Sequence, residues 1–175
     1  MIEKKYQGNY ITVTKEVIDG HIFECMSLRA GVQVIPLRGQ KILLINESRV
    51  HEHGCRCNIV SSWCDKQGRT TLDHATEKLA EEAGLVAADW EEIYNNNHPG
   101  AILNARTTFF VCRNVSELSL KLVKPDHGCE VLEQKWFTLD DVFQGIHGGL
   151  IWPDNAINYL HRLGLNLPLS KQKNL

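Results

Sequence analysis

The sequence predicts one layered domain of the α+β or α/β class. Its 175 residues are the length of a single ordinary domain. Hydrophobic residues make up 43% of the chain and charged residues 23%, which is the balance of a globular protein and excludes low-complexity and disordered chains. Strand-like segments come first, then a helix, then further strands and two closing helices. This order of elements is what predicts a layered mixture of helices and sheet.

The first strands are expected in a hairpin. Residues 10–14 and 20–26 are short and rich in β-branched and aromatic side chains. Asp19 and Gly20 between them form one of the strongest turn signals for two antiparallel strands. We therefore predict a β-hairpin near the N-terminus.

Two more strands are expected at residues 31–37 and 41–46, joined by a turn at 38–40. The second of them is continuously apolar, which predicts a strand covered on both faces. Residues 46–69 are polar and show no helical period, so this segment is predicted to be irregular.

The clearest predicted helix lies between Thr70 and Gly84. Thr70 and Asp73 have the spacing of a capping box, and Gly84 supplies a stop signal. The apolar residues between these signals recur at helical spacing and form one buried stripe: Leu72, Ala75, Leu79 and Ala83.

The rest of the chain is predicted to add strands and then helices. Strands are expected at 90–94, 105–113 and 130–137. Thr138 is the expected cap of a short helix, and Pro153 is expected in the first turn of a second helix that ends before Gly164.

Charge and apolar content exclude several function classes. Lys and Arg number 19 and Asp and Glu number 21, so the formal net charge is −2. Such a chain lacks the basic surface of a nucleic-acid-binding protein. No apolar run approaches the about 18 residues of a membrane span, and residues 1–6 lack the apolar core of a signal peptide. We predict a cytoplasmic protein with reduced cysteines and without nucleic-acid or membrane partners.

The predicted helix carries a charged flank beside its buried stripe. A step of 100° per residue places Lys78, Glu81 and Glu82 on this flank, with Glu82 nearest the buried edge. Carboxylates on a helix would offer oxygen ligands to Mg²⁺. The alternative is a solvated helix face with salt bridges, which many surface helices have.

Several segments resemble one known family. Residues 79–85 are similar to the end of the Nudix box, G-x5-E-x7-R-E-U-x-E-E-x-G-U, in which U is a bulky aliphatic residue. Residues 43–49 resemble the strand that ends in Arg in the ADP-ribose pyrophosphatase branch, and residues 98–100 resemble its Pro-Gly loop. Residues 130–139 resemble its late strand, and residues 149–151 lead to its closing helix.

This resemblance implies a fold and a domain plan. The fold is the Nudix α/β/α sandwich around a mixed β-sheet, preceded by an N-terminal β-hairpin. The whole chain, 1–175, would be a single Nudix-like domain with its core at 31–165 and a tail at 166–175. Residues 1–30 resemble the segment that related pyrophosphatases use for dimerisation, which implies a homodimer.

The resemblance also implies a reaction and its site residues. Glu81 and Glu82 would bind Mg²⁺ or Mn²⁺ and act in the hydrolysis of a pyrophosphate bond. Glu130, with Glu133 as second choice, would be the base or an extra ligand. The implied substrate is a nucleoside diphosphate linked to another moiety, ADP-ribose first. Its implied binding residues are Arg49, Pro99 and Gly100.

Four of the nine specified box positions depart from the family pattern. Trp63 and Arg69 replace the first Gly and the first Glu, and Glu77-Lys78 replaces the Arg-Glu pair. Lys78 lies on the flank of Glu81 and Glu82, so its ammonium is predicted to pair with one of them at i+3 or i+4. A cation there weakens metal binding. Three functions stay open: a hydrolase with a weakened site, an inactive protein that binds a nucleotide-like ligand, and an interaction module.

Other reactive residues have ordinary interpretations beside the functional ones. The alternating residues His51, His53, Cys55 and Cys57 suggest zinc, but structural zinc sites space their cysteines by two to four residues. Cys64 is interpreted as a packed or exposed thiol rather than a nucleophile. The alternatives for His74 are a ligand contact and a solvated helix histidine, of which the second is favoured.

Overall fold

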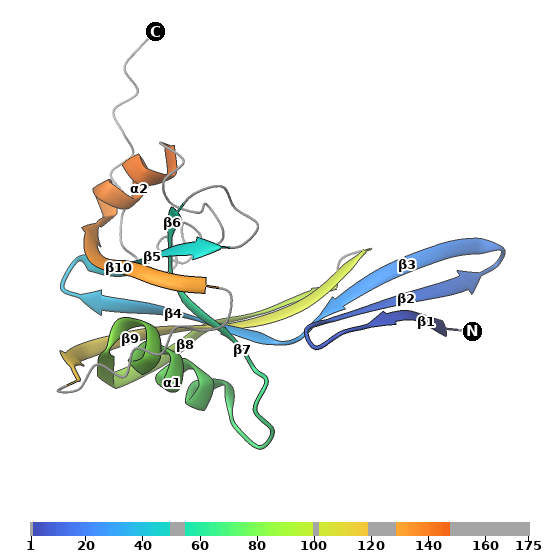
Figure 1. The fold of residues 1–175 in the computed structure, drawn as a ribbon, viewed down its shortest axis with the longest axis horizontal. Coiled ribbons are helices and arrows are strands. Elements are labelled where there is room, and N and C mark those ends of the chain that lie inside the picture. The colour runs from blue at the N-terminus through green and yellow to red at the C-terminus, as the bar shows by residue number, and fades with distance from the viewer. Residues whose placement is uncertain (1, 50–54, 100–101, 119–128, 148–175) are drawn as a thin grey trace, which may run out of the picture.

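The computed structural model describes residues 2–49, 55–99, 102–118 and 129–147, and Figure 1 shows its fold. The strands in these ranges are β1 (Ile2–Gln7), β2 (Ile11–Ile18), β3 (His21–Leu28), β4 (Gly31–Arg38), β5 (Lys41–Arg49), β6 (Cys55–Asn58), β7 (Val60–Trp63), β8 (Leu85–Pro99), β9 (Leu103–Glu117) and β10 (Cys129–Thr138). The helices are α1 (Thr71–Ala83) and α2 (Leu139–His147). No helix in the described ranges is long and apolar enough to cross a membrane.

The strands form one mixed sheet that divides into two parts. The main path runs in the order β1-β2-β3-β9-β4-β5-β10, with β9 parallel to its neighbours β3 and β4. Strands β4 and β5 pair only beside their shared turn, at Leu37–Ile42 and Arg38–Lys41. Beyond that turn β5 carries β6 and β10, whereas β4 carries β7 and β9. The group β5, β6 and β10 therefore diverges from the group β4, β7 and β9, which leaves space for buried side chains between the two groups.

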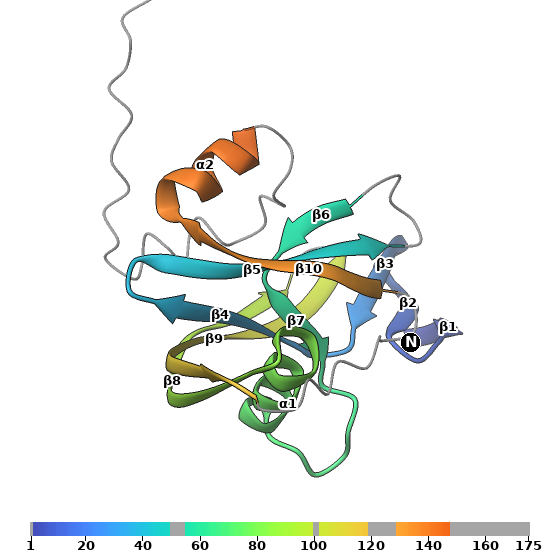
Figure 2. The same cartoon turned by 60° about the vertical axis from the view of Figure 1, so that its left-hand side comes forward.

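Two clusters of buried apolar side chains lie on either side of β4 and β5. The first joins these strands to α1 and contains Val32, Val34, Leu43, Ile45, Val60, Ala75, Leu79, Ala83, Leu85, Phe110 and Cys112. The second contains Ile35, Leu37, Ile42, Leu44, Ile59, Phe109, Val111 and Val142, the last from α2. Figure 2 shows α1 and α2 on opposite sides of the strands. The apolar run in β5 is covered on both faces, as predicted, because its residues alternate between the clusters.

Capping residues bound the two described helices at positions that the sequence predicts. Thr70 and Asp73 form a reciprocal capping box at the start of α1, and Gly84 ends the helix in the left-handed conformation with φ 61°. Thr138 and Asp141 exchange the same pair of hydrogen bonds at the start of α2. The predicted start and end of α1 and the predicted start of α2 are therefore confirmed.

The prediction of an irregular segment at 46–69 is wrong in part. Within it, β6 pairs with β5 and β7 pairs with β4. Each of these strands has four residues, too few to show an alternation of polar and apolar side chains, and β7 pairs with a strand that is not its neighbour in sequence. The strands predicted at 90–94 and 105–113 are the middle parts of the longer β8 and β9. The predicted helix at 153–163 and the tail at 166–175 lie outside the described residues.

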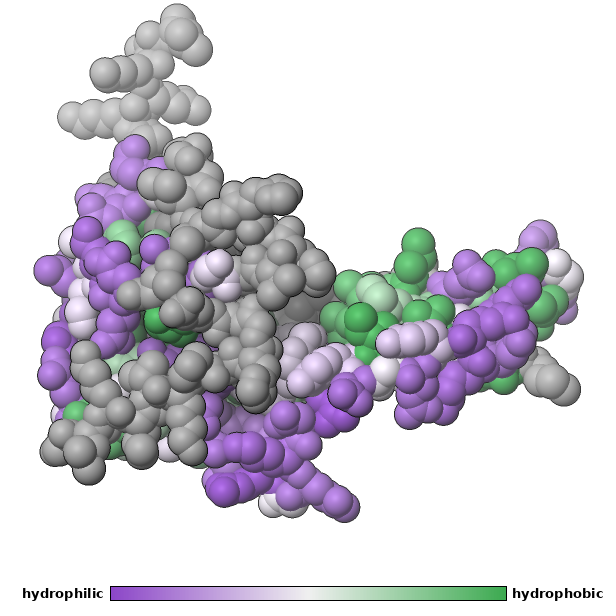
Figure 3. Space-filling view, viewed as in Figure 1, coloured by the Kyte–Doolittle hydropathy of each residue, from purple (hydrophilic) through white to green (hydrophobic). Residues whose placement is uncertain are grey.

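Strands β1, β2 and β3 form an arm that extends away from the rest of the molecule (Figure 1). The hairpin of β2 and β3 is confirmed, with Asp19 and Gly20 both at positive φ in its turn. The space-filling view shows hydrophobic residues along the surface of this arm (Figure 3). Its most exposed apolar side chains are Ile2, Tyr6, Val17, Ile18, Ile22 and Phe23, each between 48% and 64% exposed.

Candidate functional site

The charged flank of α1 is the candidate site. Ala75, Leu79 and Ala83 anchor one side of the helix in the first apolar cluster. Beside them, the ammonium of Lys78 lies 3.2 Å from Oε1 of Glu82 and 3.8 Å from Oε2 of Glu81. The predicted pairing of Lys78 is confirmed, and it reaches both carboxylates because they lie four and three residues further along the helix.

This ion cluster is largely withdrawn from water. The side chain of Lys78 is 8% exposed and that of Glu82 is 10% exposed, whereas Glu81 is 35% exposed. Buried charges are kept only when they are paired, so Lys78 and Glu82 depend on each other. The flank is therefore not the solvated helix face that was the alternative prediction.

Burial raises the pKa of Glu82 to about 7, against an ordinary value of 4.5. The positive charge and hydrogen bond of Lys78 oppose this rise, and a backbone hydrogen bond from Ser61 opposes it further. The negative charge of Glu47 adds to it. Oxygen Oε2 of Glu82 is buried and has no hydrogen-bond partner among the described residues.

Glu47 is a member of the site that sequence reasoning missed. It lies near the end of β5, is 5% exposed, and accepts a hydrogen bond of 3.1 Å from the side chain of Asn58 in β6. Leu43 and Ile45 precede it at every second position and face the α1 cluster. This alternation is the signal that places Glu47 on the same side of the sheet as Glu82.

The residues around α1 do not fit a divalent metal ion as they are arranged. Magnesium and manganese prefer several carboxylate or water oxygens without a competing cation. Here both predicted ligands, Glu81 and Glu82, are paired with the ammonium of Lys78. No group of three or more His, Cys, Asp or Glu side chains suited to a metal ion occurs among the described residues.

The late glutamates are positioned differently from the α1 cluster. In β10 the exposed Glu133 pairs with Asn46 of β5, and Asn46 pairs on its other side with Cys57 of β6. Cys57 packs against the second apolar cluster, which is the α2 side of the sheet. The structure therefore does not bring Glu133 together with Glu81 and Glu82. The backbone of Glu130 pairs with Ser48, next to Arg49 and one strand from Glu47.

The predicted substrate residues lie at two separate ends of strands. Arg49 is the last residue of β5, and its backbone pairs with Cys129. Pro99 is the last residue of β8 and pairs with Asn104 near the root of the arm, where Ile102 accepts a hydrogen bond from Met26. Gly100 lies outside the described residues.

The remaining reactive residues are a helix histidine, a thiol and the suggested zinc ligands. His74 is 4% exposed, so its interpretation as a solvated histidine is wrong; it faces the packed side of α1. Burial raises the pKa of Cys64, which disfavours a reactive thiolate. Of the suggested zinc ligands, His51 and His53 lie outside the described residues. Burial also raises the pKa of Cys57.

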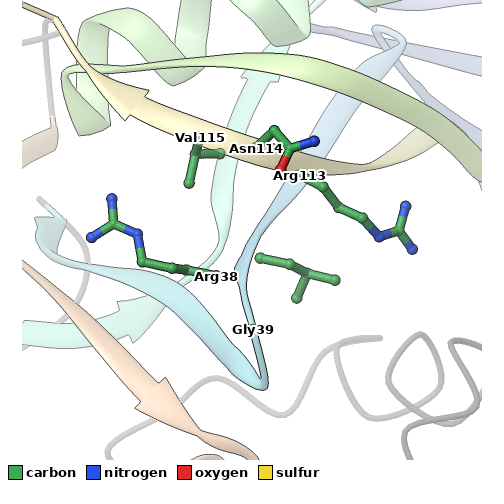
Figure 4. Close-up of a pocket in the computed structure, with 6 residues that line it drawn as sticks. Arg38, Gly39, Arg113, Asn114 and Val115 are labelled. Atoms are coloured by element: carbon green, nitrogen blue, oxygen red, sulfur yellow. The ribbon is translucent and has the colours of Figure 1, made fainter.

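A pocket of about 390 Å³ opens elsewhere, between the β4–β5 turn and β9 (Figure 4). It is lined by Leu37, Arg38, Gly39, Arg113, Asn114 and Val115. Arg38 stacks over Trp136 at 4.5 Å, and Arg113 is paired with Glu91 at 2.8 Å. The two guanidinium groups point in opposite directions, so they do not converge on an anion (Figure 4).

Comparison with known proteins gives structural matches only. No family model matches the sequence, and no curated protein matches it. A solved structure described as an ADP compounds hydrolase is 18% identical, with a TM-score of 0.67, and the match covers 94% of this chain and 89% of that one. A NUDIX hydrolase from Nitrosomonas europaea is 14% identical with a TM-score of 0.59, covering 78% of this chain and 88% of that one. The chain therefore has the fold of the Nudix hydrolases, as the resemblance of residues 79–85 predicts.

Proposed function

We propose that this protein binds a nucleoside diphosphate linked to another moiety, with ADP-ribose as the first candidate, and that metal-dependent hydrolysis of its pyrophosphate is suppressed. The fold supports the ligand class, because one structural neighbour is described as a hydrolase of ADP compounds. Sequence resemblance supports Arg49, Pro99 and Gly100 as ligand-binding residues, with Arg49 offering the fork-shaped donor that phosphate oxygens favour.

The observation that carries the suppressed hydrolysis is the position of Lys78. Its ammonium pairs with both carboxylates that the Nudix box retains, at 3.2 and 3.8 Å. A unit charge at about 4 Å repels a second like charge by ~4 kcal/mol at an effective dielectric constant of 20, and a divalent ion by twice as much. Glu81 and Glu82 are thus occupied by a cation that the chain itself supplies.

A hydrolase with a weakened site is the second candidate. It is favoured by the retention of Glu81 and Glu82 on α1 and by the exposure of Glu81, whose side chain is 35% accessible. Lysine has a long flexible stem. Turnover would require the Lys78 ammonium to leave the carboxylates, with Glu130 or Glu133 as the proposed base.

Binding and hydrolysis of ADP-ribose are expected to separate. The full chain should bind ADP-ribose equally well with EDTA and with Mg²⁺, measured by calorimetry, and should release little ribose phosphate over hours. Arg49→Ala should weaken binding roughly tenfold or more, because it removes a charge-assisted hydrogen bond to phosphate. Arg113→Ala is the control, since Arg113 is exposed and already paired with Glu91.

The two candidates predict different results in this assay. Rapid Mg²⁺-dependent turnover by the wild type would replace the binding function with the hydrolase. No binding of ADP-ribose or of related nucleoside diphosphates at millimolar concentration would contradict both and favour an interaction module.

We also propose that the protein is a homodimer held by the arm of β1, β2 and β3. Val17 and Ile22 are directly opposed on β2 and β3 and are 50% and 61% exposed. Exposed apolar side chains gathered on one element are typical of an interface.

The prediction of a cytoplasmic protein stays a prediction.

The wild-type chain is expected to have twice the mass of one chain by light scattering at micromolar concentration. The double variant Val17→Lys, Ile22→Glu should be monomeric, because it removes the apolar surface while keeping an opposed pair across the hairpin. Val86→Lys, a change at a 37% exposed position on β8, is the control and should stay dimeric. A monomeric wild type would rule out this assembly.

A further inference from the structure

We propose that the arm of β1, β2 and β3 is braced against the segment that leads into α1, and that the arm thereby controls how firmly the start of this helix is held. The brace consists of contacts made by Tyr10, Arg29, Trp63 and Lys66. All of these contacts lie within one chain, so the proposal does not rest on the homodimer or on the ligand that the protein binds.

The arm has a short connection to the rest of the sheet. Among the described strands, β3 pairs with β9 through two residue pairs, Met26 with Leu103 and Ser27 with Asn104. One further backbone hydrogen bond of 2.6 Å runs from the N–H of Met26 to the carbonyl of Ile102. The hairpin of β2 and β3 extends well beyond these contacts (Figure 1). Since elements with few contacts open locally, additional contacts at the root of the arm decide how firmly it is held.

An aromatic contact is the first link of the brace. Tyr10 lies between β1 and β2, and Trp63 is the last residue of β7. Their ring centroids are 5.6 Å apart and their planes are tilted by 30°, which is within the range of favourable aromatic pairs. The two residues are 45% and 40% exposed, so each ring is partly covered. This contact joins the root of the arm to the strand that precedes the α1 segment.

Arg29, between β3 and β4, is the second link. Its backbone N–H donates a hydrogen bond of 2.8 Å to the carbonyl of Tyr10. Its guanidinium donates to the carbonyl of Asn9 at 3.0 Å and to that of Asp65 at 3.4 Å. One side chain therefore connects the turn between β1 and β2 to the segment before α1.

The segment 64–70 continues the brace from the arm to the helix. Its first N–H, that of Cys64, donates to the carbonyl of Ala30 at 2.8 Å. The ammonium of Lys66 lies 2.5 Å from Oε1 of Glu77 on α1. Thr70, at the end of the segment, caps the helix. The contacts are thus continuous from the arm to α1, and loosening the arm removes part of the support of the residues from which the helix begins.

Two departures from the Nudix box take part in these contacts. Trp63 stands at the first Gly of the box, and Glu77 stands at the Arg of the Arg-Glu pair. Glycine has no ring to place against Tyr10, and an arginine would repel the ammonium of Lys66. The brace is therefore a property of this chain and not of the box pattern.

Hydrogen exchange of the full chain, followed by mass spectrometry, tests the brace. Tyr10→Ala should speed the exchange of backbone amides in residues 64–74 by roughly two- to tenfold, because losing an aromatic pair favours local opening. Tyr6→Ala is the matched control: Tyr6 lies on the same arm and is 57% exposed, and its ring lies beside Gly8. Tyr6→Ala should leave residues 64–74 unchanged. Tyr10→Phe keeps the ring and should also exchange like the wild type.

Arg29→Gln gives a second measurement, because it keeps both rings and removes the guanidinium donors to Asn9 and Asp65. Exchange in residues 64–74 should again rise, while β4 and β5 keep the protection of the wild type and so report an intact fold. The proposal is overturned if Tyr10→Ala and Arg29→Gln both leave residues 64–74 exchanging as in the wild type. It is equally overturned if Tyr6→Ala speeds this exchange as much as Tyr10→Ala does.

Discussion

Replacing Leu79 by alanine is expected to lower the free energy of unfolding by about 3 to 4 kcal/mol. Leu79 is fully buried at the centre of the apolar cluster that holds α1 against β4, β5 and β7. The change removes three carbon atoms and leaves a cavity, and both effects destabilise the fold. Urea unfolding followed by circular dichroism measures the loss as a lower midpoint at an unchanged slope.

Leu72 offers a matched control on the same helix. It is 39% exposed, so Leu72→Ala removes the same atoms without leaving a cavity. This variant should lose less than about 1 kcal/mol. Equal losses for the two variants would mean that α1 packs with a different face, and the position of Lys78 and Glu82 would then have to be revised.

The contrast between Leu72 and Leu79 also marks what helical spacing can predict. The spacing places both leucines on one stripe, yet Leu79 is fully buried whereas Leu72, in the first turn of α1, is 39% exposed. The capping residues Thr70 and Gly84 act on neighbours within the same turn, so the sequence predicts them correctly. Local signals therefore locate the helix, while the extent of burial depends on tertiary packing.

In the candidate site, too, contacts within the helix could be predicted, whereas contacts between elements could not. Lys78 pairs with Glu81 and Glu82 through helical geometry alone, so the sequence predicts these contacts. Ser61 comes from β7, which packs beside α1, and Glu47 comes from β5, whose Leu43 and Ile45 share an apolar cluster with α1. Their contribution could not be predicted from the helix. The alternation along β5 does contain a signal for Glu47, which is a charged residue at the position where a buried one is expected.

The stability of the protein is expected to fall as the pH rises from about 4.5 to about 7, through the carboxyl group of Glu82. Its pKa is about 7 in the folded protein, against an ordinary value of 4.5. Between these values the unfolded chain has released the proton and the folded chain has kept it, so a rise in pH favours unfolding. Below 4.5 both states are protonated, and above 7 both are ionised, so the effect is confined to this window. The difference between 4.5 and about 7 corresponds to about 3 kcal/mol.

Glu82→Gln removes this titration while keeping the size of the side chain. Urea unfolding at a series of pH values should show the variant gaining stability relative to the wild type, by about 2 to 3 kcal/mol between pH 5 and pH 8. Glu77→Gln is the opposing control, because the hydrogen bond from Lys66 lowers the pKa of Glu77 and its stabilising effect is lost as the pH falls. The Glu77→Gln variant should keep the fall in the free energy of unfolding between pH 4.5 and pH 7. Parallel profiles for Glu82→Gln and the wild type would show that the Lys78 ion pair fully offsets the burial of Glu82, and that its carboxylate is ionised in the neutral range.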